Sequence, residues 1–516
     1  MSQSPAAHQA TADQRDPRRW WALTALSLAV LLVTVDNTIL AVAIPSLTVD
    51  LAPTTAELLW IGDMYGFVLA GLLITMGSLG DKVGRKRLLM IGLVSFALVS
   101  ILAASAPSAI ALIGARGLLG VAGATLMPST LSLIRNTFLD TKERTFAIGV
   151  WSAVAAAGGG VGPILGGALL EHYWWGAVFL VNVPIVAVII VIGALSLRES
   201  KQAKPGPIDL ISAGLLLFGM ISSIYGIKEI TIVGLEHTGP WIALVLGIAA
   251  VFAFIRRQLK LESPMLDVRL FKVPAFSGAV GADLISVFGL MGVYFFLAQQ
   301  FQLADGDSPL TAGLRLLPAE TAALVGALVA AKVIYRSGRR TAIGGGIGLG
   351  AVGLLIVGLI LGDGIVPVAM AMVLIGFGFG LSLTGTSDAI LAAAPPDRAG
   401  SAAAVSETAY ELGAALGIAI LGSILAAWYR QIVVVPEGIP PTEAAATSDS
   451  LSSAYEAATH APAAIADAVL EASRVAFTSA LGVTCLIAAV MCAIGSFIAF
   501  RVLPPKNEEV DAVSDH

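Results

Sequence analysis

GSLGDKVGRKR, from Gly77 to Arg87, is a short charged stretch between two long apolar segments. Each apolar segment has about twenty residues, enough to cross a bilayer as a helix that rises ~1.5 Å per residue. The charged residues of the stretch are Asp81, Lys82, Arg85, Lys86 and Arg87. A basic cluster next to two membrane spans indicates the cytoplasmic side. The stretch therefore fixes the predicted orientation of the whole chain.

The composition is that of a polytopic membrane protein. Of the 516 residues, 57% are hydrophobic and 13% are charged, and the mean hydropathy is +0.87. A soluble chain is about one quarter charged, so this chain carries about half of that charge. Its two cysteines, Cys485 and Cys492, lie in the last apolar segment, so neither a disulfide framework nor a metal site is predicted. The sequence shows no phosphate-binding Gly-Lys-Ser/Thr motif and no nucleophile–base set, so we expect neither ATP use nor an enzyme.

The apolar segments predict an all-α fold with fourteen transmembrane helices. They cover residues 20–43, 58–79, 88–107, 109–133, 144–169, 174–196, 207–228, 239–256, 274–302, 312–334, 341–361, 365–393, 400–427 and 475–503. The loops on the side of Gly77–Arg87 are rich in Lys and Arg, whereas the opposite loops carry acids and hardly a cation. This alternation and the even number of spans place both termini in the cytoplasm.

The chain is predicted to consist of two six-helix bundles with two inserted helices. Arg336-Ser-Gly-Arg-Arg340 is a degenerate copy of the basic turn at Gly77–Arg87, and repeated helical bundles show such weak internal symmetry. The predicted parts are a cytoplasmic tail (1–19), an N-terminal bundle (20–200), two inserted helices (201–260), a C-terminal bundle (270–503) and a second cytoplasmic tail (504–516). The extracellular loop 431–474 is acidic and rich in Ala, and both a helical hairpin over 450–470 and an irregular loop fit its composition.

Three charged residues lie at one depth in the N-terminal spans. A charge inside a bilayer costs at least ~2.5 kcal/mol, so retained charges usually face a cavity or a partner. Asp36, Asp63 and Arg116 lie at similar distances from the outer ends of their spans. Arg116 is therefore expected to pair with one acid and to leave the other free. A static ion pair between two spans is the alternative to a functional role.

The C-terminal spans contain a surplus of acid. Their carboxylates are Asp283, Glu320, Asp388, Glu407 and Glu411. Glu407 and Glu411 share one helix face, and two carboxylates in a low-dielectric site cannot both ionise cheaply. We therefore expect one of them to bind a proton near neutral pH, and to hold either that proton or a cation, as antiport requires. The acid surplus predicts a cationic substrate. A hydrogen bond to a neighbouring helix is the alternative for each acid, and Asp388, near the cytoplasmic end, fits a gate.

Aromatic rings supply the second component expected of a lipophilic-cation site, since a ring face attracts a desolvated cation by up to ~2 kcal/mol. The candidates by position are Trp60, Tyr65, Phe288, Tyr294, Phe295 and Tyr410. Packing, or a position in the interfacial belt, is the alternative for each of them.

A glycine-rich stretch in the fifth span predicts a close helix contact. Gly158, Gly162, Gly166 and Gly167 permit close approach of a neighbouring helix, and Pro163 permits a bend. We expect this stretch to form a sealing or gating interface.

Four motifs in this order resemble those of the major facilitator superfamily. Gly77–Arg87 is similar to the loop signature between its second and third helices. Val35–Pro45 resembles the first-helix signature of the fourteen-helix drug–proton antiporters. Arg116–Gly120 resembles the fourth-helix motif, with Leu119 in place of the usual Gln, and Gly158–Gly167 is similar to the fifth-helix antiporter motif. Trp60–Tyr65 looks most like the quaternary-ammonium exporters of that group.

The resemblance implies a proton-coupled multidrug efflux antiporter that exports lipophilic organic cations by alternating access. We expect a protein of the bacterial cell membrane that meets drugs, protons and lipids but no nucleic acid, and that uses the proton gradient without a cofactor. A monomer is the default expectation. An exporter of a lipid, a siderophore or another endogenous metabolite on the same fold is the main alternative. A membrane sensor or scaffold is the alternative from another class.

The expected roles of the residues fall into three groups. Proton coupling is assigned to Glu407 and Glu411 and, through the resemblance, to Asp36 and Arg116. Substrate binding is assigned to Asp63, Tyr65, Trp60, Glu407, Glu411, Tyr410, Asp283 and Glu320. Gating is assigned to Gly77, Asp81, Gly84, Arg85, Gly158, Gly162, Pro163, Gly166, Gly167 and Asp388. In the family reading Asp81 and Arg85 form a cytoplasmic latch, and Gly77 and Gly84 let the backbone turn there.

Overall fold

The computed structural model describes the chain from residue 17 to residue 505 with short gaps. The described residues are 17–51, 53, 55–201, 209–233, 236–261, 264, 266–307, 309–361, 364–395, 399–436, 439–460 and 463–505. The side chains of some helical residues, Asp63 and Pro163 among them, lie outside the description. Helices connected by turns and short loops make up the described residues, and no strand occurs among them.

The helices occur in the predicted order. The first half contains α2 (Arg18–Leu51), α3 (Thr55–Val83), α4 (Arg85–Ala104), α5 (Ala109–Thr137), α6 (Thr141–Leu170), α7 (Ala177–Leu180) and α8 (Asn182–Ser196). The inserted pair is α9 (Leu210–Val233) and α10 (Thr238–Gln258). The second half contains η1 (Val268–Lys272), α11 (Pro274–Gln299), the π-helical η2 (Gln300–Ala304), α12 (Pro309–Ser337), α13 (Arg339–Ile360), α14 (Ile365–Ala393), α15 (Ala399–Ile432), α16 (Pro441–Asp449), α17 (Leu451–His460) and α18 (Ala463–Val502).

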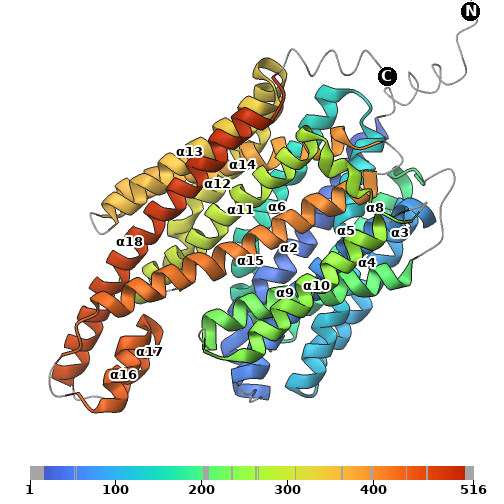
Figure 1. Ribbon diagram of the computed structural model, residues 1–516. Helices are drawn as coiled ribbons and strands as arrows, with labels where there is room; N and C mark the ends of the chain where they lie inside the picture. The colour runs from blue at the N-terminus through green and yellow to red at the C-terminus, as the bar shows by residue number, and fades with distance from the viewer. Residues whose placement is uncertain are drawn as a thin grey trace, which may run out of the picture.

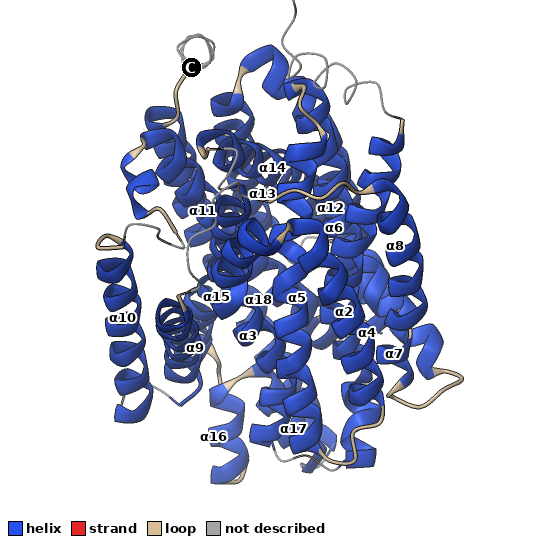
Figure 2. Cartoon of the chain, turned by 90° about the vertical axis from the view of Figure 1, so that its right-hand side faces the viewer, coloured by secondary structure: helices blue, strands red, loops and turns tan. Residues whose placement is uncertain are grey.

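These helices fit a multi-pass membrane protein. Among the described residues, thirteen helices are long and apolar enough to cross a membrane, and α9 adds a shorter apolar core, Ile211–Ile227. Figure 1 shows the two halves side by side, with α2 beginning and α18 ending at the same end of the bundle. We call this the terminal end. Helix α9 packs against α3 and α15, and α10 packs on α9 at the periphery (Figure 2).

The terminal ends of the inserted helices are joined by an ion pair. Arg257 of α10 donates two hydrogen bonds to Asp209, of 3.0 and 3.1 Å, and Ser212 donates to the same carboxylate. Burial alone would raise the pKa of Asp209, but the hydrogen bonds from Arg257 and Ser212 lower it to about 2. The inserted pair is thus fastened into one hairpin at this end.

The basic turn between α3 and α4 is tighter than predicted. It consists of Gly84 alone, with φ 118°, whereas Gly77 lies inside α3 and takes no part in the turn. A Cβ at Gly84 would lie 2.7 Å from the Glu199 carboxylate, which accepts the amide N–H groups of Lys86 and Arg87, each at 3.1 Å. Glu199 thereby satisfies the free N–H groups at the start of α4. Gly338, with φ 85°, makes the equivalent turn between α12 and α13, so the internal echo in the sequence has a structural counterpart.

Much of the described part of 431–474 is helical. Helix α17 and the beginning of α18 form the hairpin that was one of two possibilities for 450–470, and the second arm continues directly into the last span. Tyr455 of α17 donates a 2.6 Å hydrogen bond to the Leu303 carbonyl in η2, and Arg474 of α18 donates to the Tyr455 hydroxyl at 2.6 Å. The hairpin is therefore attached to the end of α11 that lies away from the terminal end.

Candidate functional site

A central cavity of about 490 Å³ lies between the two halves. Its walls come from α2, α3, α5 and α6 of the first half and from α11, α12, α14 and α15 of the second. Ile224 of α9 also contributes, so the inserted helix closes one side. The site is therefore assembled from segments far apart in the sequence, and both halves must be in place to form it.

All carboxylates of the described cavity wall come from the second half. They are Asp283 of α11, Glu320 of α12, and Glu407 and Glu411 of α15. The described wall contains no Lys or Arg. Glu320 extends toward the first half, because its Oε1 lies 3.6 Å from where a Cβ would stand at Gly159 of α6. The cavity is consequently an acidic site without a protein counter-ion in its described wall, as the surplus of acid predicts.

Three of the predicted aromatic residues line the cavity and three do not. Tyr65, Tyr294 and Tyr410 are wall residues, and the sequence reasoning missed the wall residues Phe67, Trp151 and Phe379. Trp60 instead stacks on Tyr225 of α9, with ring centroids 5.8 Å apart. Phe288 is buried in packing, and Phe295 is exposed at the surface of α11. Trp60, Phe288 and Phe295 are thus absent from the described wall.

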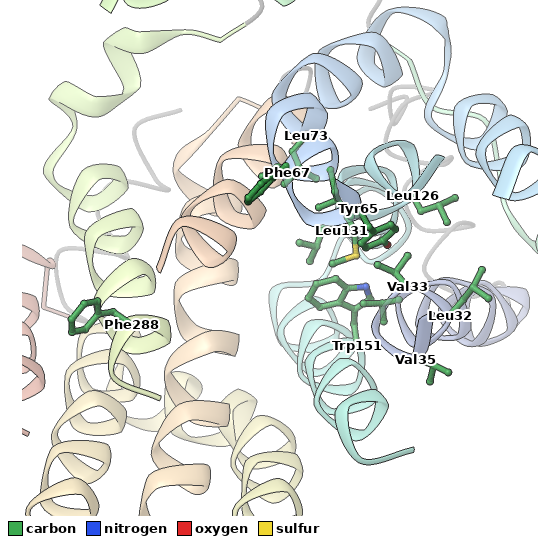
Figure 3. Close-up of a cluster of buried hydrophobic side chains, with 14 of the residues drawn as sticks. Leu32, Val33, Val35, Tyr65, Phe67, Leu73, Leu126, Leu131, Trp151 and Phe288 are labelled. Atoms are coloured by element: carbon green, nitrogen blue, oxygen red, sulfur yellow. The ribbon is translucent and has the colours of Figure 1, made fainter. Parts of the chain in front are cut away.

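Tyr65 separates the cavity from a buried polar cluster. Figure 3 shows Tyr65, Val33 and Trp151 close together in the first half, while Phe288 lies apart on α11. The Trp151 indole donates a 3.2 Å hydrogen bond to Thr130, which fixes its ring. On the side away from the cavity, the Arg116 guanidinium lies 4.7 Å from the centroid of the Tyr65 ring, in a cation–π contact.

The buried cluster behind Tyr65 is an ion pair with additional hydrogen bonds. Arg116 of α5 pairs with Asp36 of α2 at 3.1 Å, and both side chains are 0% exposed. Arg116 also donates to the Ile61 carbonyl of α3 at 3.1 Å. Asn182 of α8 donates to the other Asp36 oxygen at 2.7 Å. Arg116 therefore pairs with one acid, as the depth argument expects, and the side chain of Asp63 lies outside the described residues.

Asn182 was not singled out from the sequence. A single amide side chain in the apolar run Leu180-Val-Asn-Val-Pro184 is the signal that could have indicated it, because a buried amide requires partners. It is 0% exposed and also donates to Ser100 of α4 at 3.2 Å. Asn182 thus connects three helices around Asp36.

A first lock joins the halves at the terminal end. Arg85 donates to Asp81 Oδ1 from Nε at 2.8 Å and from Nη2 at 2.6 Å. The other Asp81 oxygen accepts the backbone N–H of Ser401 at 3.2 Å, in the first turn of α15. A carboxylate is stabilised there by the positive end of the helix. The two residues predicted as a latch therefore connect the first half to the second.

A second lock surrounds Asp388. This fully buried residue of α14 accepts from Arg339 of α13 at 2.8 Å and from Thr145 of α6 at 3.2 Å, and Arg144 of α6 lies 3.5 Å away. Nearby, Arg135 of α5 donates to the Ala394 carbonyl at 2.6 Å. These hydrogen bonds and ion pairs join the two halves at the terminal end. Roles in gating stay predictions.

The glycines of α6 pack against α2 within the first half. A Cβ at Gly158 would collide with Thr34, and one at Gly162 with Thr38, so the two helices are in close contact. Thr38 donates to the Gly158 carbonyl at 3.3 Å across this contact. Gly166 is buried, Gly167 has open space around it, and the Pro163 side chain lies outside the described residues. The predicted close helix contact is present, whereas sealing or gating by this stretch stays a prediction.

Comparison with known proteins decides the family. The sequence profile of the Major Facilitator Superfamily matches residues 26–418. The chain belongs to this superfamily. It is therefore a membrane transporter and not an enzyme, and no cluster of His, Cys, Asp or Glu in the described structure could hold a metal ion.

The similar proteins match over almost their whole lengths. The multidrug efflux pump LfrA of Mycolicibacterium smegmatis is 45% identical over 92% of this chain and 94% of its own. The methyl viologen resistance protein SmvA of Salmonella typhimurium is 37% identical over 89% of this chain and 93% of its own. The human organic anion transporter MFSD10 has a similar structure, with a TM-score of 0.62 over 94% of this chain and 100% of its own, at 14% identity. This last similarity concerns the fold alone.

Proposed function

We propose that this transporter is a proton-coupled antiporter that exports lipophilic organic cations from a bacterial cell. The observation that carries the proposal is the acidic cavity, with four carboxylates and no Lys or Arg in its described wall. Its volume of about 490 Å³ falls within the range of about 300–1,000 Å³ typical of sites for drug-sized molecules. A desolvated cation with apolar groups would find both a counter-charge and aromatic faces there.

The relatives support export and a positively charged substrate. LfrA is named a multidrug efflux pump, and SmvA is named for resistance to methyl viologen, which is a dication. The similarity to SmvA extends over most of both chains, so we expect this cavity to accept positively charged substrates as well.

Glu407 and Glu411 are the proposed exchange site. They lie one turn apart on α15, and both reach the cavity wall. A proton bound to either carboxyl removes the charge that holds the cation, so the two ligands exclude each other. Protons entering from outside would release the cation outward, and loss of protons inside would permit reloading. Asp36 and Arg116 would join this coupling only after their buried pair opens.

The terminal end is proposed to face the cytoplasm. Many basic residues lie at this end, among them Lys86 and Arg87 in the first turn of α4, Lys201, and Arg269 and Lys272 of η1. The positive-inside rule places such residues in the cytoplasm. With both locks formed there, the structure would represent a transporter closed toward the cytoplasm. We further propose that it works as a monomer in the cell membrane.

Transport by everted membrane vesicles tests the proposal. With an acidic lumen, the wild type should accumulate tetraphenylphosphonium, and a protonophore should abolish the accumulation. Glu407→Gln and Glu411→Gln should each lower it at least tenfold, while Glu171→Gln, an exposed acid near the other end of α6, should not. Accumulation that survives a collapsed proton gradient would contradict antiport. Transport of a neutral lipid or an anionic metabolite with unchanged rates in the Gln variants would favour the alternative substrate classes.

A further inference from the structure

Asp283 differs from the other carboxylates of the cavity. It is 0% exposed, although it belongs to the cavity wall. Thr386 of α14 donates a 2.6 Å hydrogen bond to its Oδ1, and the Ser406 hydroxyl of α15 also faces the carboxyl. Its Oδ2 has no hydrogen-bond partner among the described residues. Because this oxygen is buried, a drug-sized cation cannot contact it, whereas the oxygen has room in its hydrogen bonding to carry a proton.

Depth along the helices separates Asp283 from the residues nearer the middle of the bundle. It lies nine residues after Pro274, the terminal-end start of α11, which is ~13 Å at 1.5 Å per residue. Glu411 lies twelve residues into α15, or ~18 Å, and Glu320 lies seventeen residues from the terminal end of α12, or ~26 Å. Glu407, eight residues into α15 or ~12 Å, lies at the level of Asp283. Asp283 is thus at the terminal-end floor of the cavity beside Glu407, below Glu411 and Glu320.

The surroundings of Asp283 supply no positive charge. The titratable groups in electrostatic contact with it are Glu407 and Tyr410 of α15. Helix α14 contributes the uncharged Thr386 hydroxyl. No Lys or Arg of the described structure is paired with Asp283. An ionised Asp283 would therefore face a second carboxylate without a counter-ion, an arrangement that favours a bound proton.

Helix α14 connects Asp283 to the second lock. Thr386 and Asp388 are two residues apart, so their side chains leave the helix on nearly opposite faces. Thr386 bonds Asp283 of α11, and Asp388 bonds Arg339 and Thr145 of the lock. A change at the Asp283 carboxyl can thus be transmitted to the lock through one turn of one helix.

We propose that Asp283 is a proton-binding site separate from the carboxylates that contact the drug, and that Thr386 links its proton occupancy to the Asp388 lock. This inference rests on the proposed proton coupling. In the ionised state Thr386 donates its hydroxyl hydrogen to Asp283 Oδ1. When a proton from cavity water binds Oδ2, a turn of the carboxyl brings the new O–H to Thr386 Oγ1, whose own hydrogen turns to the Leu383 carbonyl, 3.0 Å away. One proton is taken up, and no other covalent bond changes.

Two transport assays with one probe test the inference. Reconstituted protein is loaded with labelled tetraphenylphosphonium, and we compare accumulation driven by a proton gradient with exchange of labelled for unlabelled probe without a gradient. Asp283→Asn should lower gradient-driven accumulation at least tenfold and leave exchange within twofold of the wild type. Thr386→Val should lower accumulation severalfold and shift its pH optimum. Thr384→Val is the matched control, because it makes the same change on α14 at a hydroxyl that has no partner in the described structure.

The outcomes separate this inference from the proposed function. If the wild type shows no gradient-driven accumulation, the proposed function fails and the inference fails with it. If the wild type is coupled and Asp283→Asn is equally coupled, the inference alone is wrong. If Asp283→Asn loses exchange and probe binding together, as expected for Glu411→Gln, then Asp283 contacts the drug and the separation is wrong. Should Asp283→Asn fail to fold, the Thr386→Val and Thr384→Val pair decides, since equal accumulation in the two would overturn the link through α14.

Discussion

The two halves of this transporter treat their buried carboxylates in opposite ways. In the first half, Asp36 is fully buried and is neutralised by Arg116 and hydrogen-bonded by Asn182. In the second half, four carboxylates reach the cavity and no Lys or Arg belongs to its described wall. In the first half the negative charge is neutralised by a protein side chain, whereas the charges in the second half have no protein cation beside them in the described wall.

The difference shows that burial of an acid alone does not identify a transport site. A buried ion pair is held because removing one partner leaves an uncompensated charge, at a cost of about 3–5 kcal/mol. An acid without a cation can be compensated by a proton or by a bound cation, and exchange between these two states is what antiport requires. The presence or absence of a protein counter-ion is therefore the property that divides the halves.

Removing Arg116 should produce the largest effect on stability. Arg116→Ala leaves Asp36 buried without its cation, so we expect the free energy of unfolding to fall by about 3–5 kcal/mol. Thermal unfolding of the purified protein in detergent measures this change. The double variant Arg116→Ala/Asp36→Asn should recover a large part of this loss, because it removes the uncompensated charge. A double variant as unstable as Arg116→Ala would show that the charge is not the cause.

A side chain at Gly84 should produce the next largest effect. Gly84→Ala places a Cβ on a backbone with φ 118°, 2.7 Å from the Glu199 carboxylate. We therefore expect the free energy of unfolding to fall by about 1–3 kcal/mol. Gly114→Ala, inside α5 with nothing within 4 Å of the new Cβ, should be neutral or slightly stabilising. Equal melting temperatures for the two variants would contradict the strained geometry of the turn.

Neutralising a cavity acid should change transport and spare the fold. For Glu411→Gln we expect at least a tenfold loss of cation transport, equivalent to about 1.4 kcal/mol, with no loss of thermal stability, because no protein cation loses its partner. Asp36→Asn in the first half should instead lower stability. The comparison between the halves would fail if both variants destabilised the protein equally.

Opening the first lock should have the smallest effect. Arg85→Ala removes the hydrogen bonds that hold Asp81 in place at the start of α15. We expect a severalfold lower rate of turnover with unchanged binding of tetraphenylphosphonium, measured by equilibrium binding to the purified protein. A weaker affinity with an unchanged rate would place Arg85 in substrate binding instead.

Much of the fold could be predicted from the sequence because membrane spans depend on local composition. Each apolar segment coincides with a helix of the described structure, and depth along the helices indicated that Arg116 would pair with an acid at its level. The prediction that Gly77 takes part in the turn was wrong, because one residue with positive φ, Gly84, suffices between α3 and α4.

The rest depends on which helices become neighbours, which composition does not specify. Trp60 was expected at the substrate, yet the inserted α9 brings Tyr225 against its ring. Asn182 reaches Asp36 only because α8 packs on α2. Likewise, Thr145 and Arg144 of α6 contact Asp388 only because the two halves pack together there. Each of these contacts joins residues that are far apart in the chain.

Proton release on drug binding tests the central claim most directly. Tetraphenylphosphonium is added to the purified protein in weakly buffered detergent solution near neutral pH, and the change in pH is recorded. We predict that the wild type and Asp36→Asn release protons as the cation binds, and that Glu407→Gln/Glu411→Gln releases none. Undiminished proton release by the double Gln variant would show that Glu407 and Glu411 are not the exchange site, and its loss in Asp36→Asn alone would place that site in the first half. Either result would contradict the account.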